Sequence, residues 1–491
     1  MTQKQGVERS STGINGLDDI LGGGLPCRRL YLVEGDPGAG KTTLSLQFLR
    51  AGVKMGEKCL YVTLSETKEE LTAGAHSHGW SLDGIDIVEM VADEAELDSE
   101  AQVTMYSQSE VELATMIERI LEAVSNVNPH RVVFDSLSEL RLLAQSSLRY
   151  RRQILALKSF FAGRQCTVLL LDDHTSEGSD LQLQSIAHGV ISLEQHAPLY
   201  GAARRRLRIV KLRGSDFRGG YHDFSIKQGG LIVYPRLVAA EHSHSFTRGP
   251  IKSGIRALDA LLGGGPERGT STLVMGPAGT GKSTLAIQYA VAAAERGDHA
   301  SIFAFDESLQ TLEARTSALG IKFTAGRDAG QISLRQVDPA ELSPGEFVHL
   351  VRESVETNHA KIVIIDSLNG YLLAMPDENY LINQLHELLT YLGRRGVTTM
   401  MVAAQHGLFG SNMVSPVDTS YLADMVVLLR FFEYAGKVKK AVSVVKKRSG
   451  PHEETIRELR FSSEGIALSE PLQQFRGILT GVPVETVRRG D

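Results

Sequence analysis

The feature that most limits how this chain can fold is a glycine-rich motif that occurs twice, 241 positions apart. Residues 35–42 and 276–283 both fit the pattern G-x-x-x-x-G-K-[ST]. Each motif follows a short apolar run and precedes residues with apolar side chains at helical spacing. Glycines let the backbone turn several N–H groups toward one phosphate, and the following helix adds its positive end. The sequence therefore predicts two phosphate-binding loops, each between a strand and a helix.

The other residues of the two motifs indicate binding of a nucleoside triphosphate. Lys41 and Lys282 would place a positive charge on the β- and γ-phosphates, which makes them candidate catalytic residues as well. The hydroxyls of Thr42 and Ser283 would ligate Mg²⁺. The predicted cofactor-binding residues of the two loops are Gly35, Gly38, Gly40, Lys41, Thr42, Thr43, Gly276, Gly279, Gly281, Lys282, Ser283 and Thr284.

The two motifs belong to a longer internal repeat. Residues 13–24 return as residues 254–265, again 241 positions later. This period is far longer than that of a solenoid repeat, so it indicates a duplicated domain. We expect an N-terminal domain at residues 1–240 and a C-terminal domain at residues 241–491. The boundary region, residues 236–250, lacks apolar periodicity and ends in a Gly-Pro pair.

Each copy alternates strand-like runs with helical segments. Residues 111–124 show helical spacing before the apolar run 132–135, and residues 380–392 do so before the run 397–403. This alternation is typical of an α/β fold, in which helices cover a mainly parallel sheet.

Acidic residues follow the predicted strands at positions where phosphate chemistry would need them. Asp135 and Asp366 each end an apolar run, where a carboxylate can hold Mg²⁺ directly or through water. The alternative is an ordinary aspartate at a strand end. Glu66, Asp306 and Glu307 follow the second strand of each copy and are candidate general bases. The alternative for these three is an acidic residue favoured by a helix N-terminus.

Two basic pairs recur late in each copy. Lys211 and Arg213 have the same spacing as Lys446 and Arg448, so each pair lies on one face of a predicted strand. One interpretation is a contact with the γ-phosphate of a nucleotide bound to a neighbouring subunit. The other is a solvated strand edge, where lysine prevents unwanted pairing.

Composition and charge limit the other classes of function. The chain is 42% hydrophobic and 22% charged, which is typical of globular proteins. A net charge of −6 gives no general indication of a nucleic acid or a membrane surface as partner. The apolar runs are too short for a transmembrane helix, and the three cysteines are far apart with no CxxC pair. We therefore expect a cytoplasmic protein with reduced cysteines.

The order of these motifs, repeated in both halves, resembles the double-domain KaiC family of RecA/DnaB-type ATPases over about residues 8–485. The resemblance implies two tandem RecA-like P-loop ATPase domains, each a mainly parallel sheet flanked by helices. It implies a homohexamer with ATP and Mg²⁺ between subunits. It also implies ATP hydrolysis in the first domain and Ser/Thr autophosphorylation in the second. On this pattern Lys211, Arg213, Lys446 and Arg448 match residues that reach a neighbour's ATP.

The phosphorylated pair of that family aligns with Ser420 and Tyr421. Ser420 keeps a hydroxyl of the right kind, whereas the oxygen of Tyr421 lies farther from the backbone, which argues against a second phosphorylation step. Thr419 is a neighbouring candidate. The alternative is an unmodified turn, for which residues 416–420 have a suitable composition.

The sequence also departs from the family elsewhere. The paired glutamates of the family become Ser65-Glu66 in the first copy, so hydrolysis there should be weak if the missing carboxylate is the base. In the second copy Asp306 keeps the charge but has a shorter reach. Because the chain stops soon after residues 477–483, we expect no KaiA partner and no KaiA-driven oscillation. KaiB-like or other signalling proteins remain candidate partners.

Two other classes of function compete with an autophosphorylating ATPase. A RecA/RadA-like DNA-dependent ATPase would need basic loops that face DNA. The densest basic clusters, residues 204–206 and 437–440, are each expected just before a strand, and a solvated hairpin explains them. A nucleic-acid partner is therefore not expected. The third possibility is a non-catalytic scaffold that assembles when it binds nucleotide, and Ser65 and Tyr421 are compatible with it.

Overall fold

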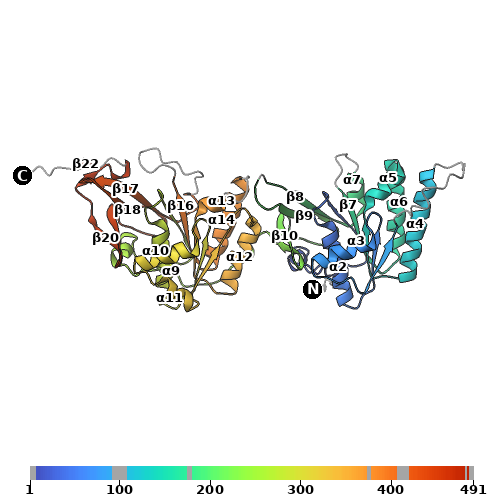
Figure 1. The fold of residues 1–491 in the computed structure, drawn as a ribbon, viewed down its shortest axis with the longest axis horizontal. Coiled ribbons are helices and arrows are strands. Elements are labelled where there is room, and N and C mark those ends of the chain that lie inside the picture. Colours follow the sequence, from blue (N-terminus) through green and yellow to red (C-terminus); the bar gives the residue numbers. More distant parts are fainter. Residues whose placement is uncertain are drawn as a thin grey trace, which may run out of the picture. The chain divides into compact units, whose positions relative to one another are not determined.

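The computed structural model of the chain describes residues 7–90, 108–173, 180–198, 200–372, 378–405, 420–480 and 484–485. The chain divides into two compact units, Met1–Arg236 and Leu237–Asp491. We describe each unit by itself, and Figure 1 labels their elements. Among the described residues, no helix combines the length and the apolar character needed to cross a bilayer.

The strands of the first unit are β1 (Arg9–Ser10), β2 (Leu25–Pro26), β3 (Leu30–Gly35), β4 (Cys59–Thr63), β5 (Ile85–Glu89), β6 (Arg131–Asp135), β7 (Thr167–Asp173), β8 (Gly189–His196), β9 (Arg204–Leu212), β10 (His222–Lys227) and β11 (Gly230–Tyr234). The helices are α1 (Asn15–Ile20), α2 (Lys41–Lys54), α3 (Lys68–Ser77), α4 (Gln108–Val127), α5 (Leu137–Ala144), α6 (Ser147–Ala162) and α7 (Asp180–Ile186).

The strands of the second unit are β12 (Ser271–Gly276), β13 (Ala300–Ala304), β14 (Ile332–Gln336), β15 (Ile362–Asp366), β16 (Thr398–Ala404), β17 (Met425–Tyr434), β18 (Lys437–Lys447), β19 (Arg457–Ser462), β20 (Gly465–Pro471), β21 (Phe475–Arg476) and β22 (Val484–Glu485). The helices are α8 (Arg256–Leu261), α9 (Lys282–Glu295), α10 (Leu309–Ala318), α11 (Phe323–Asp328), α12 (Pro344–Glu356), α13 (Leu368–Leu372) and α14 (Glu378–Arg394), and two short 3₁₀ helices are η2 (Ala239–Glu241) and η3 (Ile478–Thr480).

The two units share one sheet topology. The first sheet has nine strands in the order β5-β4-β6-β7-β3-β8-β9-β10-β11, and the second has the order β14-β13-β15-β16-β12-β17-β18-β19-β20. In each sheet the first six strands pair in parallel and the last three add antiparallel hairpins. The predicted fold class, two tandem RecA-like domains with mainly parallel sheets, is confirmed.

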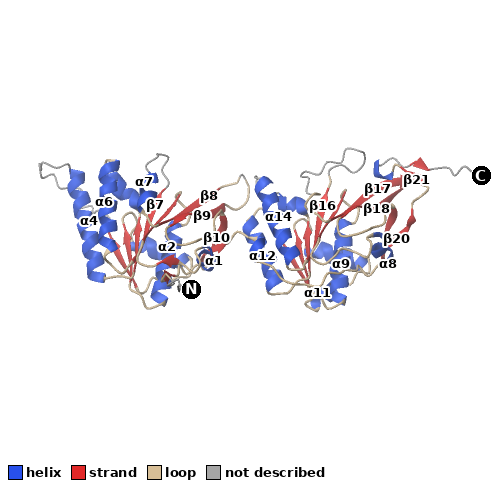
Figure 2. Cartoon of the chain, turned by 180° about the vertical axis from the view of Figure 1, so that it is seen from behind, coloured by secondary structure: helices blue, strands red, loops and turns tan. Residues whose placement is uncertain are grey.

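Helices cover both faces of each sheet (Figure 2). Each face has its own hydrophobic core. In the first unit α1, α2 and α3 pack on one face, and α4, α5, α6 and α7 pack on the other. In the second unit α8 to α11 cover one face, and α12, α13 and α14 cover the other. Strands that are buried on both faces need apolar side chains throughout, which explains the continuous apolar runs in the sequence.

The strand register brings the chemically active residues to one edge of each sheet. In the first unit Gly35 pairs with Asp173, and Thr63 pairs with Asp135. In the second unit the corresponding pairs are Gly276 with Ala404 and Ala304 with Asp366. These residues lie at the carboxyl ends of parallel strands, which is where open α/β sheets bind ligands.

The expectation that the two basic clusters precede a strand is wrong. Arg204 begins β9 and Lys437 begins β18, so both clusters lie within strands. The hairpin pairing extends into them: Gln195 pairs with Arg205. Side chains of the clusters are also paired, because Arg206 contacts Glu194 at 2.9 Å.

The packing of α1 on β11 allows no side chain at Gly16. A Cβ atom built there would lie 2.0 Å from the carbonyl oxygen of Val233. We expect Gly16→Ala to destabilise the first domain by about 1–3 kcal/mol, because the backbone of helix or strand must move. Calorimetric thermal unfolding of the full chain would measure this.

The repeat supplies a matched control, because the corresponding residue of the second domain is Ala257. Ala257→Gly should lower stability only by the helix propensity difference, about 1 kcal/mol. An unchanged or raised melting temperature for Gly16→Ala would contradict the packing argument.

Candidate functional site

The second domain contains a pocket of about 640 Å³ at the carboxyl edge of its sheet. The loop before α9 forms one side of the pocket, and residues that follow β13 and β15 form another. The far end is formed by Ala318 and Leu319 at the end of α10 and by Lys440 and Phe461 from the antiparallel strands. A volume of this size is in the range of small-ligand and cofactor sites.

The loop residues of this pocket lie as a phosphate-binding loop requires. Gly279 and Gly281 have φ angles of 80° and 101°, values that favour glycine. Lys282 is 7% exposed, and its ammonium group donates to the carbonyl oxygen of Pro277 at 2.8 Å. Burial lowers the pKa of Lys282, and the nearby carboxylate of Asp366 opposes this shift.

Asp366 lies beside the loop at the end of β15. Burial raises the pKa of Asp366, although a hydrogen bond from Ser283 opposes the shift. This hydroxyl and carboxylate are the two ligand types that P-loop proteins use to hold Mg²⁺. Both carry oxygen atoms, which Mg²⁺ prefers.

Three further side chains line the phosphate end of the pocket. Asp306 accepts a hydrogen bond from the Ser367 hydroxyl at 2.5 Å. Glu307 is held by Arg315, whose Nε and terminal nitrogen donate to its two oxygens at 3.1 and 2.6 Å. Arg315 also donates to the hydroxyl of Thr284, beside the predicted Mg²⁺ ligand. Arg315 therefore connects the candidate base with the phosphate-binding loop.

The opposite end of the pocket is more apolar. The ring of Phe461 packs against the loop, since a Cβ atom at Gly281 would lie 2.1 Å from it. The ammonium group of Lys440 lies 4.8 Å from the centre of the same ring. An aromatic ring next to Leu319 can contact a flat heterocycle, so this end suits the base of a nucleotide.

The first domain has the same frame with different charges. Lys41 is 8% exposed and donates to the carbonyl oxygen of Gly35 at 2.7 Å. It also pairs with a carboxylate, that of Asp173 at 2.7 Å, whereas Lys282 has no ion pair with any described residue. The register places Ala404 at the position of Asp173 in the second domain. A phosphate that binds Lys41 must therefore compete with Asp173.

Asp135 is the centre of a small network in the first domain. Its Oδ2 atom accepts hydrogen bonds from Thr42 at 2.9 Å and from Tyr61 at 2.5 Å. Burial raises the pKa of Asp135 despite these bonds. Burial also raises the pKa of Glu66, and the nearby carboxylates of Asp135 and Glu70 add to the shift.

The two basic pairs make the same contacts in both domains. Lys211 donates to the carbonyl oxygen of Gln184, and Arg213 donates to that of Ser185 at 2.8 Å. Lys446 and Arg448 donate to the carbonyl oxygens of Ser420 and Tyr421 at 2.8 and 3.0 Å. The Ser420-Tyr421 segment therefore occupies the position that Gln184-Ser185 has in the first domain.

The geometry brings together most of the predicted site residues of each domain. In the second domain, the predicted loop residues other than Gly276 line one pocket together with Asp306, Glu307 and Asp366. Gly276, Lys446 and Arg448 are not among the residues that line it. Thr419 lies outside the described residues.

Sequence reasoning missed Tyr61, Arg315 and Phe461, and it considered Lys440 only as part of a basic cluster. For Asp173 it left open a phosphate-sensing role and an ordinary turn at a strand end. These residues come from other strands or helices, so no local motif marks them. Only the comparison of the two copies draws attention to Arg315, because the first copy has Gly74 at the corresponding position.

Comparisons with known proteins agree with this geometry. A family model described as the KaiC ATPase matches residues 10–238 and 251–473. The circadian clock oscillator protein KaiC of Picosynechococcus sp. is 28% identical over 487 residues, which covers 98% of this chain and 93% of the relative. The protein of the same name from Acaryochloris marina is 28% identical over 484 residues, covering 97% and 91%. KaiC 1 of Synechocystis sp. is 27% identical over 488 residues, covering 98% and 92%.

Arg315 offers a test of the second-domain pocket. In a Lys41→Ala background, we expect Arg315→Ala to lower ATP turnover about tenfold, or about 1.4 kcal/mol, because Glu307 loses its anchor and the loop loses a positive charge. Steady-state phosphate release would measure this. Arg327→Ala is the matched control, since Arg327 pairs with Glu313 but is not among the residues that line the pocket. Equal turnover in the two variants would contradict a role for Arg315.

Asp135 offers a test of stability. Because burial raises its folded-state pKa, the protonated carboxyl stabilises the fold at low pH, and this contribution is lost as the pH rises through that pKa. At pH 7 the buried carboxylate therefore destabilises the nucleotide-free domain. Asparagine keeps one oxygen acceptor for both Thr42 and Tyr61. We expect Asp135→Asn to raise the melting temperature at pH 7 by about 2–4 °C.

The gain should shrink as the pH falls and the wild-type carboxyl, whose pKa burial raises, takes up its proton. Asp173→Asn is the matched control, because Asp173 is paired with Lys41 at 2.7 Å and its removal should give no gain. A lower melting temperature for Asp135→Asn at pH 7 would refute the argument.

Proposed function

Because the chain belongs to the KaiC ATPase family, we propose that it is an ATP-hydrolysing signalling protein that forms a homohexamer and phosphorylates itself on Ser420. The observation that carries the proposal is the contact between Lys446 and the carbonyl oxygen of Ser420, at 2.8 Å. It fixes a serine beside the basic pair that, in this proposal, faces a neighbour's ATP.

The pocket of the second domain supports ATP as the substrate. The phosphates would lie on the loop N–H groups and on Lys282, and the adenine would lie toward Leu319 and Phe461. Ser283 and Asp366 would hold Mg²⁺, as would Thr42 and Asp135 in the first domain. The described residues contain no group of three or more metal-ligating side chains. In this proposal the cation is held by one carboxylate, one hydroxyl and the phosphates.

The proposed transfer takes place between subunits. The Ser420 hydroxyl oxygen attacks the γ-phosphorus of an ATP bound to a neighbouring copy, and an O–P bond forms. The bond between the γ-phosphorus and the β,γ-bridging oxygen breaks, and ADP leaves. Asp306 of the ATP-binding copy accepts the hydroxyl proton, since it lies at the phosphate end of the pocket. Lys446 and Arg448 would neutralise charge on the transferred group.

The first domain would hydrolyse ATP more slowly. Ser65 supplies no carboxylate at the position of Asp306, so Glu66 is the remaining candidate base. Asp173 also neutralises Lys41 at 2.7 Å, and bound phosphate would have to displace it. The proposal includes no daily rhythm, because the clock function belongs to relatives that are only 27–28% identical.

Incubation with Mg-ATP tests the autokinase directly. We expect one phosphate on Ser420, found by mass spectrometry of peptides that cover residues 419–421. The label should be lost in Ser420→Ala and fall at least tenfold in Asp306→Asn, because the proton acceptor is removed. Asp306→Glu should keep the label, since it retains the carboxylate.

Other outcomes would point to the competing functions. ATP turnover without any label would remove the kinase activity and leave an ATPase. Turnover no greater than that of a Lys41→Ala/Lys282→Ala variant would indicate a scaffold that binds nucleotide without catalysis. Stimulation of turnover by single-stranded DNA, with salt-sensitive binding, would indicate a DNA-dependent ATPase.

A further inference from the structure

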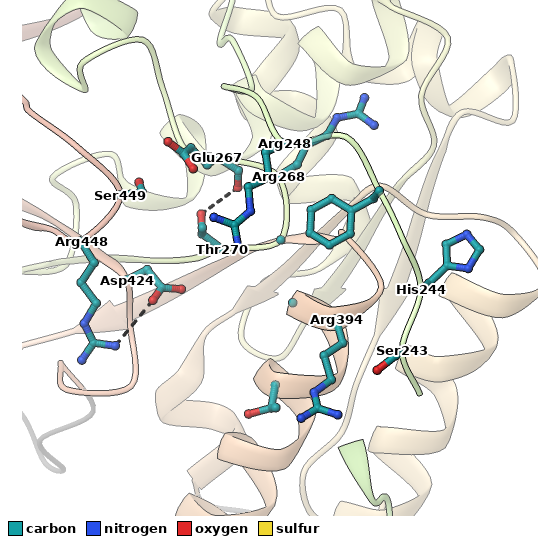
Figure 3. A pocket seen from close by; sticks show the side chains of 14 residues that line it. Ser243, His244, Arg248, Glu267, Arg268, Thr270, Arg394, Asp424, Arg448 and Ser449 are labelled. Carbon is teal, nitrogen blue, oxygen red and sulfur yellow. Dashed lines mark hydrogen bonds and ion pairs between the residues drawn. The ribbon is translucent and has the colours of Figure 1, made fainter. Parts of the chain in front are cut away.

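The second domain has another pocket, far in sequence from the P-loop motif and lined by arginines. It has a volume of about 570 Å³, and its lining includes Arg248, Arg268, Arg394 and Arg448 (Figure 3). Arg268 precedes β12, Arg394 ends α14 and Arg448 follows β18. The pocket therefore lies near the amino end of β12, whereas the P-loop follows its carboxyl end.

The charge of the lining is positive. The four arginines are accompanied by two acidic residues, Glu267 and Asp424. The carboxylate of Asp424 contributes to the fold, because it accepts hydrogen bonds from the Ser271 N–H at 3.0 Å and from the Ser271 hydroxyl at 3.1 Å. Its ion pair with Arg448 is long, at 3.6 Å. The pocket thus keeps positive charge that the surrounding acidic groups do not neutralise.

The arginines of this pocket make only weak contacts with other residues. Their ion pairs are long, and their other partners are backbone carbonyl oxygens. Arg268 pairs with Asp298 at 3.5 Å, and Arg394 donates to the carbonyl oxygen of Ala239 at 3.2 Å. Within the described part of the chain, Arg248 has no ion-pair partner. Weakly paired guanidinium groups can turn toward a ligand at little cost.

The internal repeat shows that the fold does not need these arginines. The first copy has the same topology, yet three of the four positions carry uncharged residues there. In the order given above, the corresponding residues are Val7, Cys27, Gly163 and Arg213. Since the shared fold forms without them, the additional arginines of the second copy require another explanation.

The wall of the pocket is held in place by residues 243–249. The N–H of His244 donates to the carbonyl oxygen of Arg394 at 3.3 Å, and the N–H of Arg268 donates to that of Gly249 at 2.9 Å. The ring of Phe246 packs against Gly269, where a Cβ atom would lie 2.6 Å from it. The backbone of this wall is therefore held in place without a ligand, which reduces the entropy cost of binding.

We propose that this pocket binds an anion that carries a diphosphate group. Guanidinium groups bind phosphate oxygens in pairs, and several of them around one cavity favour a ligand with several negative charges. The cavity is also larger than a single phosphate needs and falls in the range of nucleotide-sized ligands. A free diphosphate and a nucleoside diphosphate share this chemistry.

Calorimetric titration with inorganic pyrophosphate tests the site. The full chain would carry Lys41→Ala and Lys282→Ala, so that the P-loops do not contribute and a failed proposed function leaves this test valid. We expect about one pyrophosphate per chain. The affinity should fall at least tenfold in Arg268→Ala/Arg394→Ala, and less in Arg268→Lys, which keeps the charge but loses the paired hydrogen bonds. Arg256→Ala is the matched control, an exposed arginine of the same domain that is not part of the lining.

Thermal unfolding would show whether each variant is folded. If the double variant does not fold, Arg248→Glu replaces it, because Arg248 is exposed and its substitution should leave the fold intact. Titration with ADP in the same background distinguishes the two sources: tighter binding than pyrophosphate indicates a nucleotide, and equal binding indicates recognition of the diphosphate alone. The proposal is overturned by absence of pyrophosphate binding, by equal affinity in the pocket variants and the control, or by sulfate binding as tightly at the same ionic strength.

Discussion

Both domains depend on the burial of one lysine ammonium group at the start of a helix. Lys41 and Lys282 are less than one-tenth exposed, and a helix N-terminus is an unfavourable place for a positive charge. Their own loops compensate this charge, because glycines with positive φ let the chain turn carbonyl oxygens toward the ammonium group. The same turn leaves N–H groups for a phosphate. One conformation of the loop therefore stabilises the nucleotide-free domain and also forms the phosphate-binding site.

The duplication kept this frame and changed the charges around it. Asp173 pairs with Lys41, whereas Ala404 at the same register leaves Lys282 without that partner. Arg315 anchors Glu307 in the second domain, where the first domain has Gly74. Substitutions at such positions leave the sheet and its cores unaffected. Two domains with one topology can therefore carry different electrostatics and, in the proposed function, different rates.

The antiparallel hairpins position functional side chains, as the parallel sheet does. In both domains a register shift occurs in the first hairpin, next to Val190 and next to Val426. Such a bulge redirects neighbouring side chains. In both domains the adjacent basic residues, Lys211 and Lys446, reach the carbonyl oxygens of the segment before the hairpin. This shared contact links the serine of the proposed transfer to a feature of the fold.

The sequence by itself determined the repeat, the fold class and the loop residues. These features are local: spacing within a strand, a glycine turn and a helix start are fixed by residues that are neighbours in the chain. It also placed Asp135 and Asp366 at strand ends, which parallel register then brought to the edge that holds the loops.

Only the tertiary structure decided which charges meet. Asp173 reaches Lys41, and Phe461 covers Gly281, across strands that are more than a hundred residues apart in the chain. The four arginines of the second pocket likewise come from four separate segments. Such contacts depend on strand order and register, which no short stretch of sequence contains. Burial of the groups then sets the directions of the pKa shifts.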